Sequence, residues 1–514
     1  MVPLETEPNI EVLRAYSILA TKEVERLARE LAAARQQKTE EGFLSDELRD
    51  KLVKLQEMFF GFGRENDHRS PTHHKGQQLL LHGDRQSDEI IPKAGPEKEV
   101  LTPKTSFYKM AVEELRSEAL SRGFKMSEAA DWDEVVGLTQ DSVEITVIER
   151  TYEKVIHKQQ KYRFRPSIGT DKEIIVTAPG PVKLKPGCQY SADFGIAVVT
   201  DKYELHLPLE RQRRKMEAAG LDVSVKTLYG LCRTVAEHAN EVLPLIKEDI
   251  FNDKRVAVHL DETTWPIIGA ESQSYLWVMS NRSATYFQFE PTRSGKIAEE
   301  MLKGYEGAII SDGFSGYNRF KGKPKIIVGN CWAHFRREFY DIRGNYPKQA
   351  TEILDLIDGL MGIEHRAKTW DELRALRETE SAAAAKKIYE WLLEERQKHL
   401  PSSGMVKAID YGLGRWKELT VYIKHLPLPL TNNDAERALR HSVLGRKNFA
   451  GSKSIDGADI AATLYTIVES CKKASIQPRN YLKYVIEEHW HKRQTLSPLR
   501  YSWMKNGKPA RVGQ

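Results

Sequence analysis

Three acidic residues lie where carboxylates could hold catalytic metal ions. Asp261 and Asp312 each follow a short apolar run, at 256–260 and 308–311, and Glu436 lies in a polar segment further on. Magnesium takes hard oxygen ligands at about 2.1 Å. A pair of such ions about 3.5–4 Å apart activates the attacking oxygen and stabilises the leaving oxygen of an in-line phosphoryl displacement. The three residues therefore predict metal-dependent phosphoryl transfer, with Mg²⁺ as the cofactor and Mn²⁺ as its substitute.

Each carboxylate also has a purely structural interpretation. An Asp after an apolar strand is often a turn or cap residue. Asn433 stands three residues before Glu436, so the two could form a capping box at a helix N-terminus. Asp434 is a rival ligand, although two positions away it should point off the face of Glu436. Considered singly, these alternatives stay open; finding both aspartates on the expected strands favours a metal site.

The elements around the carboxylates follow the order of the ribonuclease-H-like fold. A strand leading to Asp261 precedes an aromatic-rich hairpin, a helix, a buried strand that delivers Asp312, another strand and a basic helix with His334. The predicted hairpin strands, helix, buried strand and last strand cover 275–279, 285–289, 295–302, 308–311 and 326–328. In that fold the first and fourth strands are neighbours, so we expect Asp261 and Asp312 to lie close together.

Cations accompany the predicted metal site and are candidates for binding DNA phosphates. Arg437 adjoins Glu436, and Arg440 lies one helical turn beyond it on the same face, which suits a phosphate substrate. The segment 445–453 combines glycines, cations and an aromatic residue, and as a loop it could hold phosphates. A solvated basic turn is the alternative for this segment. The candidate DNA contacts here are Arg336, Arg337, Arg437, Arg440, Arg446 and Lys447.

A second candidate DNA-binding region lies at 201–250. One helix ends near Gly220, and Ser224 can cap the next helix, which is the helix-turn-helix pattern. Arg213, Arg214 and Lys226 make the region basic and are further candidate DNA contacts. An ordinary helical hairpin would show the same pattern.

The N-terminal part of the chain shows three kinds of pattern. Leucine-rich spacing in residues 1–60 is typical of a coiled coil, formed either between two copies of the chain or as a hairpin within one. The polar residues 61–103 predict a flexible linker. His73 and His74 in this linker have no ligand partners at useful spacing. Residues 104–200 include alternating segments that predict a small β-rich module.

The predicted fold is an α/β ribonuclease-H-like catalytic core with an α-helical insertion. An N-terminal helical coiled-coil segment and a small β plus helix-turn-helix region precede it, as a chain of 514 residues needs more than one core. The predicted domains are a coiled-coil segment 1–60, a linker 61–103, a β-rich module 104–200, a helix-turn-helix-like region 201–250, a catalytic core 251–344 and 430–450, a helical insertion 345–429, and C-terminal helices with a basic tail 451–514.

Composition narrows the protein class. A net charge of +5 permits a nucleic-acid partner without arguing for one. The four cysteines form no CxxC pair, which argues against a disulfide scaffold, an iron–sulfur site and a zinc ribbon. No stretch approaches the roughly 18 apolar residues that a membrane span needs. These features predict a cytoplasmic protein with no membrane partner, associated with the nucleoid when it binds DNA.

Several short motifs, in a fixed order, carry a family resemblance. They are Asp-Glu-Thr-Thr-Trp at 261–265, Ser-Asp-Gly-Phe-Ser-Gly-Tyr-Asn at 311–318, Cys-Trp-Ala-His-Phe-Arg-Arg at 331–337, Asn-Asn-Asp-Ala-Glu-Arg-Ala-Leu-Arg at 432–440 and Gly-Arg-Lys-Asn at 445–448, with further likeness at 202–212 and 478–482. On these motifs the chain resembles the insertion sequence 66 family of bacterial DDE transposases, over about residues 145–490. The resemblance implies that Asp261, Asp312 and Glu436 are the catalytic triad.

One feature departs from that family. Members usually carry a zinc-binding module with two CxxC pairs before the region of 178–181. Here the residues 162–167 occupy about the place of the second pair and contain no cysteine. Zinc is therefore not expected as a cofactor, and neither are the DNA contacts that this module would make.

The resemblance implies a transposase that binds the terminal inverted repeats of its own mobile element. It would cleave these ends to free a 3′ hydroxyl and transfer the strand into target DNA, as a homo-oligomer and together with small accessory proteins of the same element. The alternatives are a metal-dependent nuclease of the same fold, a non-catalytic DNA-binding descendant and a coiled-coil scaffold.

Overall fold

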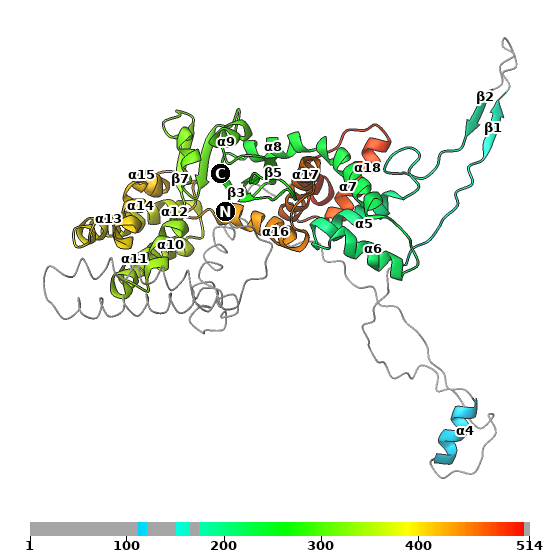
Figure 1. Ribbon diagram of the computed structural model, residues 1–514, viewed down its shortest axis with the longest axis horizontal. Coiled ribbons are helices and arrows are strands. Elements are labelled where there is room, and N and C mark those ends of the chain that lie inside the picture. Colours follow the sequence, from blue (N-terminus) through cyan, green and yellow to red (C-terminus); the bar gives the residue numbers. More distant parts are fainter. Residues whose placement is uncertain (1–111, 122–150, 165–173, 508–514) are drawn as a thin grey trace, which may run out of the picture. The chain divides into compact units, whose positions relative to one another are not determined.

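A computed structural model describes residues 112–121, 151–164 and 174–507 (Figure 1). The predicted coiled coil of 1–60 and the linker of 61–103 lie outside the described residues. The described chain divides into two compact units, one made of 179–216 and 222–507 and the other of 112–121, 151–164, 174–178 and 217–221. Within these described ranges, no helix is both long and apolar enough to cross a membrane.

The smaller unit contains a helix and a β-ribbon. The helix α4 spans Val112–Ser121, and the antiparallel strands β1 and β2 span Lys161–Phe164 and Ile174–Thr177. Of the alternating segments expected within 104–200, the one at 174–176 forms the strand β2, and the one at 145–148 lies outside the described residues.

A five-stranded mixed sheet organises the larger unit. Its strands are β3 (Val258–Thr264), β4 (Tyr275–Ser280), β5 (Thr285–Glu290), β6 (Gly307–Ser311) and β7 (Ile326–Asn330). They lie in the order β5-β4-β3-β6-β7. The strand β4 is antiparallel to both of its neighbours, whereas β3, β6 and β7 run parallel. The predicted adjacency of the first and fourth strands, β3 and β6, is confirmed, and the helix α9 (Gly295–Met301) precedes β6 as expected.

Burial along the strands follows from the helices that cover the sheet. Five of the six residues of β4 are buried in succession, as in a strand covered on both faces. The edge strand β5 is protected by α17 (Ile455–Lys473). Hydroxyls of this helix accept from the otherwise unpaired backbone of β5, Thr466 from Phe287 N at 2.9 Å and Ser470 from Thr285 N at 3.2 Å. The helix therefore closes a sheet edge that would otherwise be open to pairing with another chain.

Helices that precede the sheet in the chain and helices that follow it pack together. Those before the sheet are α5 (Ala192–Tyr203), α6 (Leu209–Ala218), α7 (Val225–Asn240) and α8 (Leu243–Asn252), and those after it include α16 (Asn433–Phe449), α18 (Pro478–Trp490) and α19 (Pro498–Asn506). The helices α5, α7, α17 and α18 contact one another. The predicted domain boundaries at 200 and 250 fall inside α5 and α8.

The predicted helix, turn and capped helix at 209–233 is confirmed as local structure. The helix α6 ends before Gly220, whose φ of +80° suits glycine, and Ser224 Oγ accepts from Thr227 N at 3.0 Å to cap α7. One face of α7 is buried against other helices, including at Leu228 and Val235.

Residues 332–423 are helical, as predicted for the segment between the last strand and Glu436. The α-helices are α10 (Trp332–Ile342), α11 (Pro347–Ile363), α12 (Trp370–Leu376), α13 (Ala382–Arg396), α14 (Gly404–Leu413) and α15 (Trp416–Thr420). Between and after them lie the short 3-10 helices η4 (Glu364–Arg366) and η6 (Val421–Ile423) and the π-helical segment η5 (Arg377–Ser381), and the 3-10 helix η3 (Ser315–Phe320) lies earlier, after β6.

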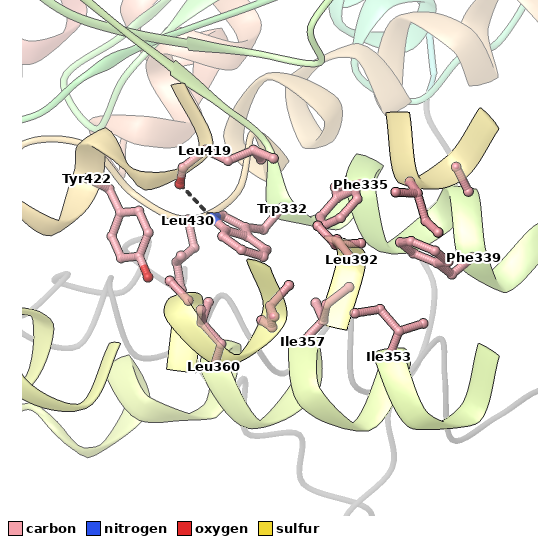
Figure 2. Close-up of a cluster of buried hydrophobic side chains, with 14 of the residues drawn as sticks. Trp332, Phe335, Phe339, Ile353, Ile357, Leu360, Leu392, Leu419, Tyr422 and Leu430 are labelled. Atoms are coloured by element: carbon pink, nitrogen blue, oxygen red, sulfur yellow. Dashed lines mark hydrogen bonds between the residues drawn. The ribbon is translucent and has the colours of Figure 1, made fainter. Parts of the chain in front are cut away.

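One apolar cluster joins these helices to the sheet (Figure 2). Trp332 lies at its centre, and its ring Nε1 donates to Leu419 O at 2.7 Å. Phe335 of α10 packs with Ile357 of α11, and Ile310 of β6 belongs to the same cluster. Burying this surface stabilises the helices and the parallel side of the sheet together, at about 25 cal/mol per Å².

Candidate active site

Asp261 lies in the middle of β3, the central strand of the five-stranded sheet. The sequence predicted that the strand would end at residue 260, but it continues to Thr264 because Asp261 pairs with Val278 of β4 and the following residues pair in turn. Alternation along a strand puts Asp261 and Glu262 on opposite faces of the sheet. The predicted strand end is therefore wrong. Because Asp261 lies inside a paired strand, its backbone is held more rigidly than it would be at a strand end.

Asp312 directly follows β6, as predicted. The parallel register that pairs His259 with Ile310 brings the residues after β6 beside Asp261. Phe314 N donates to Asp312 Oδ1 at 2.8 Å, and the following Gly313 has a φ of +92°. This turn therefore has a conformation that favours glycine.

The helical segment holds the Asp312 turn from outside the sheet. Tyr411 of α14 donates its hydroxyl to Asp312 O at 2.7 Å, and Arg415 donates to Gly313 O at 3.2 Å. A Cβ on Gly313 would lie 2.8 Å from Arg415 Nε. Tyr411 and Arg415 were not predicted from the sequence, because no local pattern connects them to a turn about a hundred residues earlier.

Glu436 lies in the first turn of α16, but it is not part of a capping box. The N-cap is Asn432, one residue earlier than predicted, and Asn433 is already helical. Asn432 is fully buried, and its Nδ2 donates to Leu260 O at 2.8 Å. This contact ties the start of α16 to the strand that carries Asp261, so Asn432 is a third positioning residue that the sequence did not predict.

Asp261 is buried within electrostatic reach of the other two predicted carboxylates. Burial, and then the negative charges of Asp312, Glu262 and Glu436, raise the pKa of Asp261 well above its ordinary value. Glu436 Oε1 is buried and finds no hydrogen-bond donor among the residues that the structure describes. Carboxylates that burial and like charge destabilise in this way are suited to binding a cation.

Asp434, the rival ligand, has a different environment. Lys473 of α17 lies 2.6 Å from its Oδ2, and Ser280 of β4 donates to the same atom at 3.0 Å. Although burial alone would raise it, Lys473 and then His259 hold the pKa of Asp434 well below its usual range. Asp434 is therefore a paired structural carboxylate between the helix and the sheet.

Glu262 supports the site from the opposite face of β3. Its carboxylate accepts from Tyr317 OH at 2.6 Å and from Arg293 Nε at 2.7 Å. Arg293 also lies 4.1 Å from the ring centroid of Phe314, in the turn after Asp312. The acidic pair Asp261-Glu262 in the sequence is thus divided between two roles by strand alternation.

The chain matches the model of the family described as "Transposase IS66 family" over residues 187–460, more than half of its length. The chain belongs to this family. Three relatives of this transposase-family protein are uncharacterized proteins of Sinorhizobium fredii (strain NBRC 101917 / NGR234). They are y4hP, 29% identical over 66% of this chain and 66% of the relative, y4qI, 26% identical over 70% and 68%, and y4jD, 25% identical over 66% and 70%. The chain thus spans about two thirds of the length of these relatives.

The cations that sequence analysis selected in this family member have unequal surroundings. Arg337, Arg437, Arg440 and Lys447 are exposed. Arg336 instead pairs with Asp358 of α11 at 2.6 Å, which ties two helices together.

Residues 445–449 belong to the helix α16, which continues to Phe449. The prediction of a loop over 445–453 is therefore wrong for these residues. Gly445 is buried where a Cβ would meet the hydroxyl of Tyr465, so this glycine serves helix packing rather than a turn. Arg446 donates to Thr263 Oγ1 at 3.1 Å and to Thr264, whereas Lys447 and Lys453 of this stretch are exposed.

In the upstream helix pair, Arg213 and Arg214 both contact Glu210, at 3.0 and 3.3 Å. Lys226, at the start of α7, is exposed. Of these three cations, Lys226 is the one that the structure leaves best available to a phosphate.

Proposed function

We propose that this member of the transposase family is a DDE transposase, in which Asp261, Asp312 and Glu436 hold the catalytic metal ions. The observation that carries the proposal is the convergence of the three acids. The parallel pairing of β3 with β6 and the tie from Asn432 to Leu260 bring them together, and their charges act on Asp261. Folding does not require buried carboxylates to lie near one another, since their like charges destabilise the folded state.

The order and direction of the strands support a ribonuclease-H-like core. In chain order the strands lie third, second, first, fourth and fifth, and the fourth and fifth run parallel to the first. The first strand carries Asp261, the fourth delivers Asp312, and a helix after the helical segment carries Glu436. These are the positions that the sequence motifs require.

The donor atoms fit magnesium, with manganese as a substitute. All three side chains offer carboxylate oxygens, the ligands that Mg²⁺ prefers, and Glu436 Oε1 has no donor within the described chain. When bound, such ions activate the attacking oxygen and stabilise the leaving one. The chain's own contribution is to fix the carboxylates on β3, β6 and α16 and to hold the turn of Asp312 through Tyr411.

Exposed cations next to the site suit a DNA backbone. Arg437, Arg440 and Lys447 are spaced along one exposed face of α16, starting one residue after Glu436. Arg337 adds a cation from α10. We propose that these residues bind phosphates of the terminal inverted repeats and of target DNA, in a homo-oligomer and with any small accessory proteins of the same element.

The test is a cleavage and strand-joining assay with Mg²⁺ on DNA that carries the ends of the element. Wild type should give both products, and Asp312→Asn should give neither while binding DNA as tightly as wild type. Asp341→Asn, an exposed aspartate at the end of α10, is the matched control and should keep both activities.

The outcomes separate the proposed function from its alternatives. Cleavage without joining in wild type would favour a nuclease of the same fold. Tight DNA binding without products, even with the element's other proteins added, would favour a non-catalytic DNA-binding descendant. Products from Asp312→Asn would overturn the assignment of this ligand.

A further inference from the structure

A second set of ligand atoms lies beside the proposed magnesium site. Cys331 is the N-cap of α10, and His334 follows three residues later in the first turn of that helix. Side chains at these two positions lie next to each other, as in a capping box. The Cys331 Sγ atom, a ring nitrogen of His334 and a carboxylate oxygen of Glu436 all lie within 4.8 Å of one another.

The polar atoms of this cluster are poorly satisfied by the protein. His334 Nδ1 and Glu436 Oε1 are 3.6 Å apart, and both are buried without a hydrogen bond to any residue in the described ranges. Cys331 is 1% exposed, and its Sγ accepts from Asn432 N at 3.2 Å. Because buried polar atoms are nearly always hydrogen-bonded, two such atoms 3.6 Å apart without a hydrogen bond are suited to binding one shared cation.

We propose that Cys331, His334 and Glu436 form a binding site for a zinc-class divalent cation, which shares Glu436 with the proposed magnesium site of Asp261 and Asp312. Thiolate and imidazole are soft ligands that select zinc-like ions, whereas magnesium takes oxygen ligands. Bonds of about 2.0–2.3 Å in a tetrahedral site put ligand atoms about 3.3–3.6 Å apart. The 3.6 Å between His334 Nδ1 and Glu436 Oε1 already matches that spacing.

The chemistry of the site balances. The thiol of Cys331 loses its proton to solvent when it coordinates the ion. One thiolate and one carboxylate then neutralise the two positive charges, and His334 binds as the neutral ring. Three protein ligands leave the fourth position of a tetrahedral site for water.

Because Glu436 belongs to both proposed metal sites, a cation bound at Cys331 and His334 would change catalytic activity. This inference rests on the proposed function. The same carboxylate is the third ligand of the proposed magnesium site, so one ion deprives the other of it. A zinc-class ion bound to Cys331 and His334 therefore competes with magnesium for Glu436 and inhibits the transposase.

The test of binding uses Co²⁺ as a spectroscopic substitute for zinc in the full-length chain. Wild type should show the near-ultraviolet absorption of a thiolate-to-cobalt charge transfer. Cys331→Ser should lose this absorption and bind zinc about tenfold or more weakly, because even outer-shell changes cost about 10–100-fold in metal affinity. Cys188→Ser, which removes a half-buried thiol outside the cluster, should retain it.

The variants allow a clear decision. Serine keeps an acceptor for Asn432 N, and His334→Gln provides a second variant if Cys331→Ser does not fold; it should also lower zinc affinity. Absence of the absorption in wild type, or its presence in Cys331→Ser, would overturn the metal site.

Activity provides an independent measurement. Zinc added to the magnesium-dependent cleavage assay should inhibit wild type and should inhibit Cys331→Ser less. If cobalt binds through Cys331 but wild type never cuts DNA, the metal site stands and the proposed function fails. If wild type cuts DNA without any cobalt–thiolate absorption, the proposed function stands and this site fails.

Discussion

Asp434 and Glu436 are two positions apart on α16, and their surroundings differ. Asp434 pairs with Lys473 and accepts from Ser280, whereas Glu436 Oε1 has no hydrogen-bond donor within the described residues. A buried ion pair that loses one partner leaves an uncompensated charge. Glu436 instead adds its negative charge to the buried Asp261, which opposes folding.

We therefore expect the two substitutions to have opposite effects. Asp434→Asn should destabilise the fold by about 3–5 kcal/mol, since Lys473 keeps its charge without a partner, but should retain DNA cleavage at low temperature. Glu436→Gln should abolish cleavage and leave the melting temperature in metal-free buffer unchanged or raised. Thermal unfolding and cleavage of both variants check this; a destabilised Glu436→Gln with activity would contradict the roles assigned here.

Lys202 is a partly exposed cation whose ammonium group is largely desolvated, and its titration affects stability. Burial lowers its pKa from 10.5 to about 8, and its Nζ lies 3.6 Å from the ring centroid of Phe449. Because the folded pKa lies below the unfolded one, charging Lys202 costs free energy in the folded state. That cost is fully present below pH 8 and disappears as the pH rises from about 8 to 10.5.

Lys202→Met should therefore stabilise the protein at pH 7. The gain should be on the order of 3 kcal/mol, reduced by the lost contact with Phe449, and should shrink toward zero near pH 10. Urea unfolding of wild type and variant at pH 7 and pH 10 measures the difference. Lys215→Met, at an exposed position of α6, should show no comparable pH dependence; an equal gain for Lys202→Met at both pH values would refute the linkage.

At the scale of elements, the helix α14 and the Asp312 turn form one unit. Tyr411 stacks parallel to Phe335 of α10 while its hydroxyl holds Asp312 O, and Arg415 lies 4.0 Å from the Tyr411 ring centroid. The helical segment thus orients a proposed metal ligand that lies on the sheet. Its contribution to catalysis is positional, since none of these groups is a proposed metal ligand.

Tyr411→Phe should keep the ring packing and lose the hydrogen bond to Asp312. We expect cleavage to fall about tenfold or more, since small displacements of a reacting group are costly, with a higher Mg²⁺ concentration at half-maximal rate and unchanged DNA binding. Tyr389→Phe, on the exposed side of α13, is the control. A normal magnesium dependence in Tyr411→Phe would show that the turn holds itself.

At the scale of the whole molecule, the helical segment shares its core with the sheet. The apolar cluster combines Ile357 and Leu392 of the helices with Ile310 of β6 and Phe335 of α10 (Figure 2). Arg377, 1% exposed, donates to Glu364 and to the carbonyl oxygens that lead back toward α16. These contacts argue that the predicted insertion depends on the rest of the chain for its stability.

A fragment of residues 345–429 should therefore not unfold cooperatively by itself. It lacks Trp332 and Phe335, whose side chains fill the centre of the cluster. The measurement is thermal unfolding of this fragment by circular dichroism, with fragment 331–430, which includes α10, as the comparison. A sharp, reversible transition in fragment 345–429 would establish an independently folding domain.

Local patterns in the sequence predicted many of the individual elements, although not the end of β3 or the helical course of 445–449. The hairpin of β4 and β5, the strand β6 before Asp312 and the helices between β7 and Glu436 follow from hydrophobic periodicity and turn residues. Adjacency of the first and fourth strands followed from their order. These predictions hold because strand and helix periodicity depends on residues close together in the chain.

Tertiary structure alone decided which polar residues meet. Sequence could not show that Asp434 would pair with Lys473, or that Tyr411 would hold the turn of Asp312. It named Cys331 and His334 within a motif but gave no reason to join them to Glu436. Such contacts depend on how distant elements pack, because a side chain's partner is set by the three-dimensional neighbours of its helix or strand and leaves no local periodicity to read.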